Sequence, residues 1–140
     1  MLNNSTPLIR LIIALSLLVE ESIECQQPAA IYHSALLKAM RKSGLTVRPR
    51  PLLAKRVNGR LTSEHTPDFI VQNKDGETVV VCLISSYQTK PADVEEAQAC
   101  LDAYRENANG LLINFGGEKL LWSLLVHNRR RFYSFERSIA

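Results

Sequence analysis

The feature that most constrains the fold is an uninterrupted run of apolar and β-branched residues at positions 78–83. A strand with one face in solvent alternates apolar and polar residues, whereas a strand covered on both faces does not. A second buried run, at residues 110–115, follows a segment with helical spacing. Such strands need helices packed on their sheet, so the sequence predicts an α/β protein with a mixed β-sheet flanked by α-helices.

The remaining elements are predicted from periodicity and from proline and glycine positions. Pro28 suits the first turn of a helix and Gly44 suits its end. Pro49 and Pro51 favour an extended stretch at a sheet edge. In full, we expect helices at 7–24, 28–44 and 91–107, strands at 68–71, 78–83, 110–115 and 120–126, an extended stretch at 45–57, a turn at 58–59 and a hairpin turn at 75–76.

The chain length of 140 residues predicts a single domain with its own hydrophobic core. We assign residues 1–126 to this domain and residues 127–140 to a basic, aromatic tail. The apolar stretch at residues 8–19 has two interpretations, a buried helix and a targeting segment. It is shorter than the roughly 20 residues that cross a bilayer, and no good cleavage site follows it. A buried helix is therefore favoured, and no membrane partner is expected.

The cysteines indicate the compartment. Cys25, Cys82 and Cys100 are widely spaced, odd in number and form no CxxC pair. This pattern favours free thiols in the cytoplasm over a secreted disulfide framework. The three histidines are scattered and show no metal-ligand spacing along the chain. We accordingly expect no metal ligands and no cofactor.

Several stretches together resemble a known family. A helix with Tyr32 follows the apolar N-terminal segment, a Pro-Asp-Phe-Ile-Val strand lies at 67–71, and an apolar strand lies at 79–83. Glu96-Ala97-Gln98 then opens a helix that leads to Leu-Ile-Asn-Phe at 112–115. These features resemble the GxxExxY proteins of the PD-(D/E)xK nuclease superfamily over roughly residues 8–126. The resemblance implies a restriction-endonuclease-like fold and metal-dependent cleavage of phosphodiester bonds.

Most of the residues that this chemistry needs are replaced. Mg²⁺ prefers hard oxygen ligands, and the family holds it with a helical Glu, a strand Asp and the Glu of a Glu-x-Lys motif. The resemblance places these groups at Ala29, Asp68, Cys82 and Ile84, the last in place of the Lys. Only Asp68 is kept, so three of the four positions are substituted. Other members of the pattern that the chain retains are Tyr32 and Gln98. A carboxylate moved to Glu20 or Glu96 is the remaining route to a rebuilt site, and Mg²⁺ is expected only in that case.

Each of these residues also has a structural interpretation. Asp68 after Pro67 suits a turn, and it is as well explained in that way as by a functional role. Cys82 and Ile84 suit core packing in a buried strand, and Tyr32 suits an aromatic packed in the interior. No His and Asn arrangement supports a cysteine hydrolase.

Charge is unevenly distributed along the chain. Residues 33–60 contain eight basic residues and no acidic one, although the net charge of the whole chain is only +3. A positive surface of this kind binds phosphate backbones through counterion release. Its residues are Lys38, Arg41, Lys42, Arg48, Arg50, Lys55, Arg56 and Arg60. The alternative is a solvated helix face. A second cluster combines Arg129, Arg130, Arg131 and Arg137 with nearby aromatic residues, which suits stacking on single strands.

Three functions remain open at this point. The first is a catalytically inactive nuclease-like domain, not an enzyme, that binds DNA or RNA through its basic residues. The second is a protein-interaction or structural subunit with no nucleic-acid role, because acidic residues gather at 93–106 and opposite charges can attract a protein partner. The third is a metal-dependent nuclease with a rearranged active site.

Overall fold

The computed structural model describes residues 6–24 and 26–127. It contains three helices and seven strands among these residues. In chain order they are α1 (Pro7–Ser22), α2 (Ala29–Lys42), β1 (Thr46–Pro49), β2 (Leu53–Val57), β3 (Arg60–His65), β4 (Phe69–Gln72), β5 (Thr78–Ile84), α3 (Pro91–Ala103), β6 (Asn109–Asn114) and β7 (Leu121–Leu125).

Five strands form the main sheet, in the order β1-β4-β5-β6-β7. β5 lies at its centre and pairs with β6 in parallel, while the other pairings are antiparallel. The parallel pair needs a crossover, which α3 provides between β5 and β6. The prediction of an α/β fold with a mixed sheet flanked by helices is confirmed.

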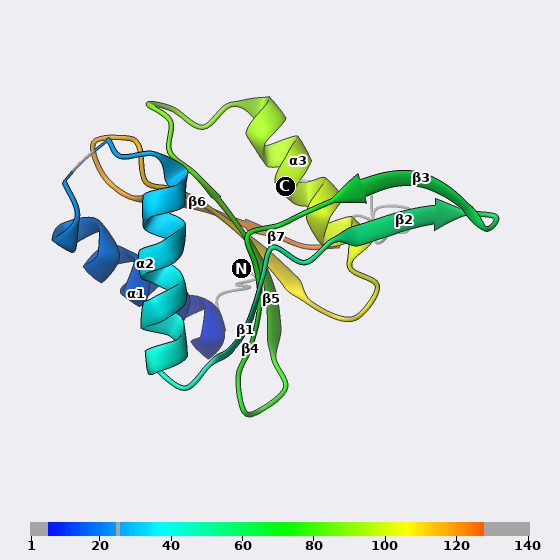
Figure 1. The fold of residues 1–140 in the computed structure, drawn as a ribbon, viewed down its shortest axis with the longest axis horizontal. Coiled ribbons are helices and arrows are strands. Elements are labelled where there is room, and N and C mark those ends of the chain that lie inside the picture. Colours follow the sequence, from blue (N-terminus) through cyan, green and yellow to red (C-terminus); the bar gives the residue numbers. More distant parts are fainter. Residues whose placement is uncertain (1–5, 25, 128–140) are drawn as a thin grey trace.

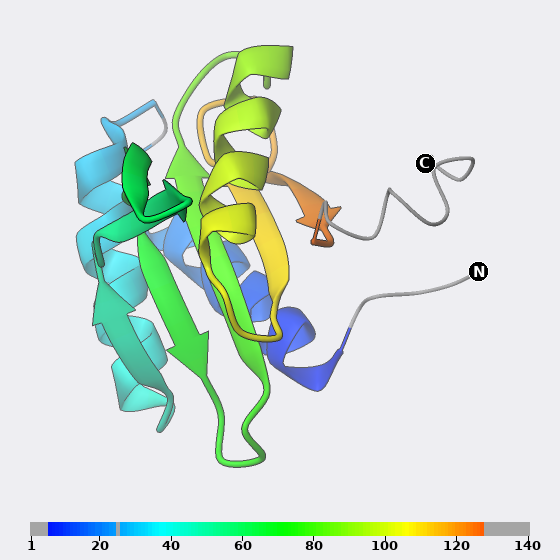
Figure 2. The ribbon, with the colours of Figure 1, turned by 90° about the vertical axis from the view of Figure 1, so that its right-hand side faces the viewer.

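The sheet is covered on both faces, as Figure 2 shows. The odd-numbered side chains of the central strands, such as Val79, Val81 and Ile113, pack under α1 and α2. The even-numbered side chains, such as Val80 and Leu112, pack against α3. This two-sided burial explains why the run at 78–83 shows no alternation of polar and apolar residues.

β2 and β3 form a separate two-stranded sheet, which projects from the body of the molecule (Figure 1). We call residues 53–65 the arm. Its turn contains Asn58 and Gly59, both with positive φ, as an Asn-Gly hairpin turn requires. The sequence prediction identified the turn and the extended stretch before it, but it missed β3. Most arm residues are exposed, so the apolar alternation that reveals a strand is lacking.

The N-terminus of α1 is capped by a carboxylate that lies next to the main sheet. The Glu77 side chain, just before β5, accepts hydrogen bonds from the Thr6 hydroxyl and from the Leu8 backbone N–H. A negative charge at a helix N-terminus is favourable because it meets unpaired N–H groups. Leu8, Ile9 and Ile12 are then buried in the core.

The apolar stretch at 8–19 was expected to form a helix buried against another part of the molecule, and α1 packs into the core on one face. One face of α1 is buried, while Leu18 is 61% exposed and Leu17 is 40% exposed. Among the described residues, no helix is both long and apolar enough to cross a bilayer.

The third helix is shorter than the predicted 91–107. It ends at Ala103 because Tyr104 takes an extended conformation and packs its side chain against the α3 side of the sheet. Its start agrees with the proline signal at Pro91, and the Asp93 carboxylate accepts the Lys90 backbone N–H at 2.9 Å. The predicted tail was residues 127–140, and its residues 128–140, which include its arginines and aromatic residues, lie outside the described residues.

Candidate functional site

Asp68 lies immediately before β4, opposite the second half of β5. Its Oδ2 accepts the backbone N–H of Leu83 at 2.7 Å. Its Oδ1 lies 3.0 Å from Nδ1 of His33 on α2. A carboxylate only accepts hydrogen bonds, so the His33 Nδ1–H is the donor. The two oxygens of Asp68 therefore link α2 to the backbone of the central strand.

His33 is fixed in place by more than this hydrogen bond. Its side chain is 9% exposed, and its ring stacks on Phe69 with centroids 4.3 Å apart. Phe69 follows Asp68 directly and is fully buried. The stacking and the hydrogen bond together fix the orientation of the His33 ring, so that its Nδ1 faces the Asp68 carboxylate. The sequence did not reveal this pair, since its members are 35 residues apart.

Cys82 and Ile84 point from β5 to the α3 side of the sheet, both partly buried. Cys82 lies beside Asp68 and Cys100. A hydrogen bond with Cys100 raises the pKa of the Cys82 thiol far above its usual range, and burial and the nearby negative charge raise it further. The Cys82 thiol is therefore neutral at ordinary pH.

The other predicted remnants are Ala29, Tyr32 and Gln98. Ala29 is the first residue of α2, and its methyl group offers no ligand. Tyr32 is fully buried and stacks on Phe115 with centroids 4.4 Å apart. Gln98 donates to the Asp102 carboxylate at 3.2 Å and to the Val126 carbonyl at 2.7 Å, so it ties α3 to the end of β7.

The donor set around Asp68 does not fit Mg²⁺. Mg²⁺ needs hard oxygen ligands in octahedral geometry, and it keeps several waters. The side chains here are one carboxylate with both oxygens already hydrogen-bonded, a neutral thiol at Cys82 and a hydrocarbon at Ile84. No hydrolytic step through a magnesium ion follows from this arrangement.

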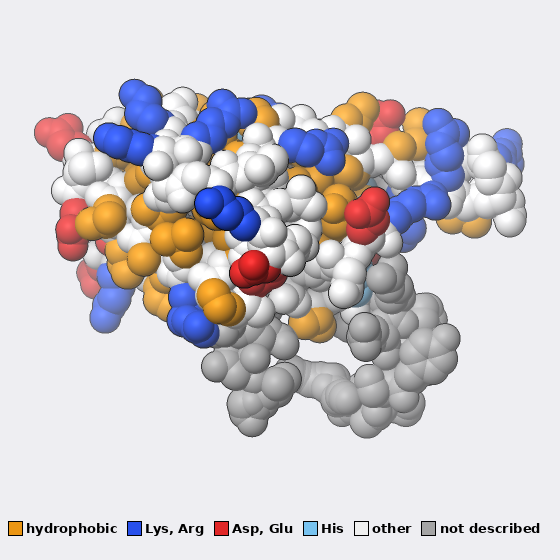
Figure 3. Space-filling view, turned by 90° about the horizontal axis from the view of Figure 1, so that it is seen from below, with side chains coloured by type: hydrophobic (Ala, Val, Ile, Leu, Met, Phe, Trp, Pro, Cys, Tyr) orange, Lys and Arg blue, Asp and Glu red, His pale blue; other side chains and the backbone are white. Residues whose placement is uncertain are grey.

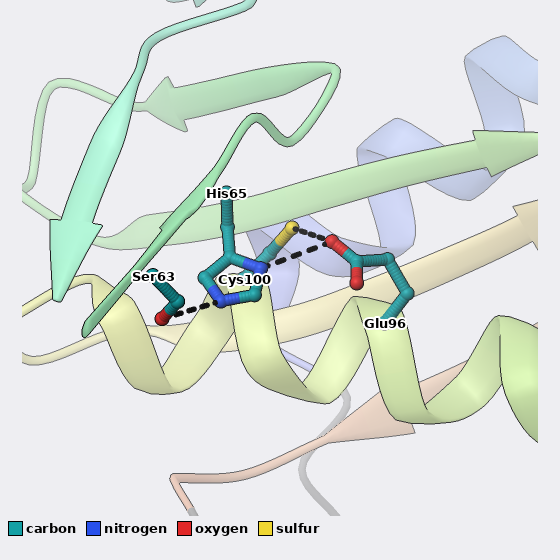
Figure 4. Close-up of polar contacts among 4 residues, drawn as sticks. All are labelled: Ser63, His65, Glu96 and Cys100. Carbon is teal, nitrogen blue, oxygen red and sulfur yellow. Dashed lines mark hydrogen bonds and ion pairs between the residues drawn. The ribbon is translucent and has the colours of Figure 1, made fainter.

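A second polar cluster lies between the arm and α3 (Figure 4). His65, at the end of β3, has its Nδ1 3.1 Å from Oε2 of Glu96 and its Nε2 3.1 Å from the Ser63 hydroxyl. The Cys100 Sγ lies 3.7 Å from the same Oε2 of Glu96. Within the described part of the chain, His65, Glu96 and Cys100 form the group of His, Cys, Asp or Glu residues that could hold a metal ion. Their possible ligand atoms all lie within 4.8 Å of one another.

Residue spacing along the chain does not predict this cluster, because β3 and α3 each contribute only part of it. The one available signal was the pair Glu96 and Cys100, which are four residues apart and therefore share one helix face. The cluster is also joined to the first site. Cys82 contacts Cys100 on one side and lies near Asp68 on the other.

The eight basic residues at 38–60 are all exposed. Lys38, Arg41 and Lys42 lie on α2, Arg48 lies on β1, and Arg50 follows it. The other three, Lys55, Arg56 and Arg60, lie on the arm. In Figure 3, Lys and Arg side chains follow the upper edge of the view and continue onto the arm at right.

Comparison with known proteins identifies a family and a solved structure of similar fold. A family model described as the PD-(D/E)XK nuclease superfamily matches residues 6–123. The crystal structure of SSO0001 is similar in fold, with a TM-score of 0.51 and 17% sequence identity. That similarity covers 70% of this chain and 50% of the SSO0001 chain, so this chain spans about half the length of its structural relative. No curated protein matches the sequence.

Proposed function

Because this chain belongs to the PD-(D/E)XK nuclease superfamily, we propose that it is a catalytically inactive member of the GxxExxY type that binds DNA or RNA. The proposal has two parts, the loss of the metal-binding carboxylates and the retention of a basic surface. We place this function in the cytoplasm, on the odd number and wide spacing of the cysteines.

The observation that carries the first part is the pair Cys82 and Ile84 beside Asp68. In a metal-dependent nuclease, carboxylates must hold the ion that activates water and stabilises the leaving oxygen. Here Cys82, which lies near Asp68, is a neutral thiol, and Ile84, the next residue on the same side of β5, is a hydrocarbon. Asp68 itself has a structural use, since it accepts hydrogen bonds from α2 and from β5. This arrangement supports a nuclease fold without the nuclease reaction.

The second part rests on the position of the basic residues relative to Asp68. The Arg50 backbone N–H donates to the Asp68 carbonyl at 2.8 Å, so the basic segment passes directly beside the degenerate site. Arg48 and Arg50 are exposed there, and the arm extends the charge outward. A phosphate backbone following this surface would meet cations from α2 to the tip of the arm, which supports binding without cleavage.

The test is salt-dependent binding to single- and double-stranded DNA and RNA, measured by fluorescence anisotropy. We expect Lys42→Ala, Arg48→Ala and Arg50→Ala together to weaken binding. The slope of log K against log salt should fall by about 0.9 per lost phosphate contact on duplex DNA.

The matched control removes three exposed cations elsewhere, with Lys74→Ala, Arg105→Ala and Lys119→Ala. It has the same net charge as the test variant, so only position differs. Equal losses in the two variants would mean that net charge alone attracts nucleic acid, and the proposed surface would be wrong. No binding by the native chain at low salt would also refute it.

One observation favours a protein-interaction role as a second candidate. A groove of about 640 Å³ runs between α1 and α2, and Leu18, Ile31 and Ala35 line it. Leu18 is 61% exposed and Ile31 is 47% exposed, which is unusual for large apolar side chains at neighbouring positions. This candidate predicts a partner that stays bound in high salt and is lost in Leu18→Ser with Ile31→Ser. Nucleic-acid binding would not change in that variant.

A further inference from the structure

We propose that His65, Glu96 and Cys100 form a zinc-binding site that joins β3 of the arm to α3. The site is separate from the family's carboxylate site and uses a different donor set. It goes beyond the proposed function and does not depend on it.

The ligand atoms already have nearly the spacing of a tetrahedral site. Zinc–ligand bonds of about 2.0–2.3 Å put the corners of a tetrahedron about 3.3–3.8 Å apart. Nδ1 of His65 lies 3.1 Å from Oε2 of Glu96, and that oxygen lies 3.7 Å from Sγ of Cys100. All three ligand atoms lie within 4.8 Å of one another. Small side-chain rotations would therefore bring them onto one ion.

The donor types select zinc over magnesium. One imidazole nitrogen, one thiolate sulfur and one carboxylate oxygen form a set that suits Zn²⁺, whereas a thiolate is a poor ligand for Mg²⁺. Glu96 and Cys100 share a helix face at i and i+4. Cys100 is 1% exposed and the Glu96 side chain is 64% exposed, so the site has a buried anchor and a route to solvent.

Ser63 completes the arrangement as a positioning residue. Its hydroxyl lies 3.1 Å from Nε2 of His65, the ring nitrogen that points away from the other two ligands (Figure 4). Histidines that bind metals commonly donate their second N–H to such a partner, which fixes the tautomer and the ring orientation. A Ser hydroxyl can donate to Nε2 while the proton is on Nδ1. It can accept from Nε2–H once a metal ion occupies Nδ1, so it orients the ring in both states.

Three protein ligands leave the fourth position for water. Cys82 neighbours Cys100, but it is not one of the three residues whose ligand atoms converge. The ion would tie the end of β3 to α3 and so hold the arm against the body. Binding would shift the His65 proton from Nδ1 to Nε2 and release the thiol proton of Cys100, so affinity should fall as pH is lowered.

The experiment is titration of the reduced full chain with Co²⁺, followed by competition with Zn²⁺. We expect a thiolate-to-cobalt charge-transfer band at a stoichiometry of one, which Zn²⁺ removes. Zn²⁺ should also raise the melting temperature and slow hydrogen exchange in residues 53–65. Cys100→Ser should abolish the band, and Ser63→Ala should weaken affinity about 10- to 100-fold.

Glu96→Gln is the second ligand variant, because its exposed position leaves folding intact, and it should weaken affinity at least as much as Ser63→Ala. The matched control is Glu95→Gln, an exposed neighbour with the same charge change, which should bind as the native chain does. The proposal is overturned if the band is absent, if Glu96→Gln and Glu95→Gln bind equally well, or if Cys82→Ser removes the band while Cys100→Ser keeps it.

Discussion

Asp68 is the residue that the resemblance places at a metal-binding position, and both of its carboxylate oxygens are engaged in hydrogen bonds within the protein. In the family that the chain resembles, the corresponding Asp is a metal ligand. Here its two oxygens accept hydrogen bonds from His33 and from the Leu83 backbone, at 3.0 and 2.7 Å. Bonds to a charged acceptor are shorter and stronger than neutral ones, so Asp68 stabilises the junction of α2 and β5.

Replacing Asp68 should therefore cost stability. In Asp68→Ala, the buried Leu83 N–H and the His33 Nδ1–H both lose their acceptor. We expect the free energy of unfolding to fall by about 1–3 kcal/mol, measured by urea denaturation. The control Asp75→Ala changes an exposed turn residue and should stay within about 0.5 kcal/mol of the native chain. Equal stability of the two variants would refute the structural role of Asp68.

At the scale of residues, the sequence predicted the environment of side chains within one strand. It did not predict side-chain contacts between different elements. It assigned Cys82 and Ile84 to core packing in one buried strand, and both pack on the α3 side of β5. It did not predict that His33 reaches Asp68, or that His65 meets Glu96 and Cys100. Those contacts depend on how α2 and the arm pack, which no local pattern encodes.

At the scale of elements, the turn after β6 is a tightly constrained connection. The buried Asn114 amide accepts the backbone N–H groups of Ser86 and Gly116, at 3.1 and 2.9 Å. Its Nδ2 donates to Thr89 at 3.0 Å. One side chain thus joins the loop after β5 to the turn after β6, which leaves little room at Gly116.

Gly116→Ala should be destabilising. A Cβ at this position would lie 2.3 Å from the Ser86 backbone nitrogen and 2.6 Å from the Ser85 carbonyl carbon, both backbone atoms that cannot rotate away. We expect a loss of about 1–3 kcal/mol in thermal or urea unfolding.

Gly117→Ala is its matched control, since the nearest atom to its Cβ would be the Tyr87 carbonyl oxygen at 3.4 Å. A Gly116→Ala variant as stable as the Gly117→Ala variant would contradict the close packing of the two loops.

The helices and the central strands were predictable from the sequence because their patterns are strong. Buried runs without alternation indicated β5 and β6, and proline and glycine marked the ends of α2 and the start of α3. The arm was only partly predicted because its strands bury too little for a periodic pattern. The end of α3 was placed too late because Tyr104 continues the apolar stripe after the helical backbone has stopped.

At the scale of the whole molecule, the sheet separates the basic residues of α2 from Cys82 and the His65 cluster. α1 and α2 cover one face, and the basic residues of α2 lie on that side. α3 covers the other face, where Cys82 and the His65 cluster lie. The basic surface begins on the α2 side, passes Asp68 at Arg50 and ends on the arm. The substituted residues Ala29, Cys82 and Ile84 are partly buried, and the proposed binding residues are exposed.

Restoring the missing groups should restore response to magnesium. Ala29→Glu, Cys82→Glu and Ile84→Lys together would put two carboxylates near Asp68, and their repulsion should lower the melting temperature without metal. Added Mg²⁺ should raise the melting temperature of this variant and leave that of the native chain unchanged. No response in the folded variant would show that these positions do not form the family's metal site.

The proposed function requires that this nuclease-like domain does not cut nucleic acid. The most direct measurement is a cleavage assay of the full chain with Mg²⁺ or Mn²⁺ on single- and double-stranded DNA and RNA, beside the Asp68→Asn variant. We predict that the native chain forms no more product than Asp68→Asn with any of these substrates. Metal-dependent cleavage by the native chain that Asp68→Asn abolishes would contradict the claim.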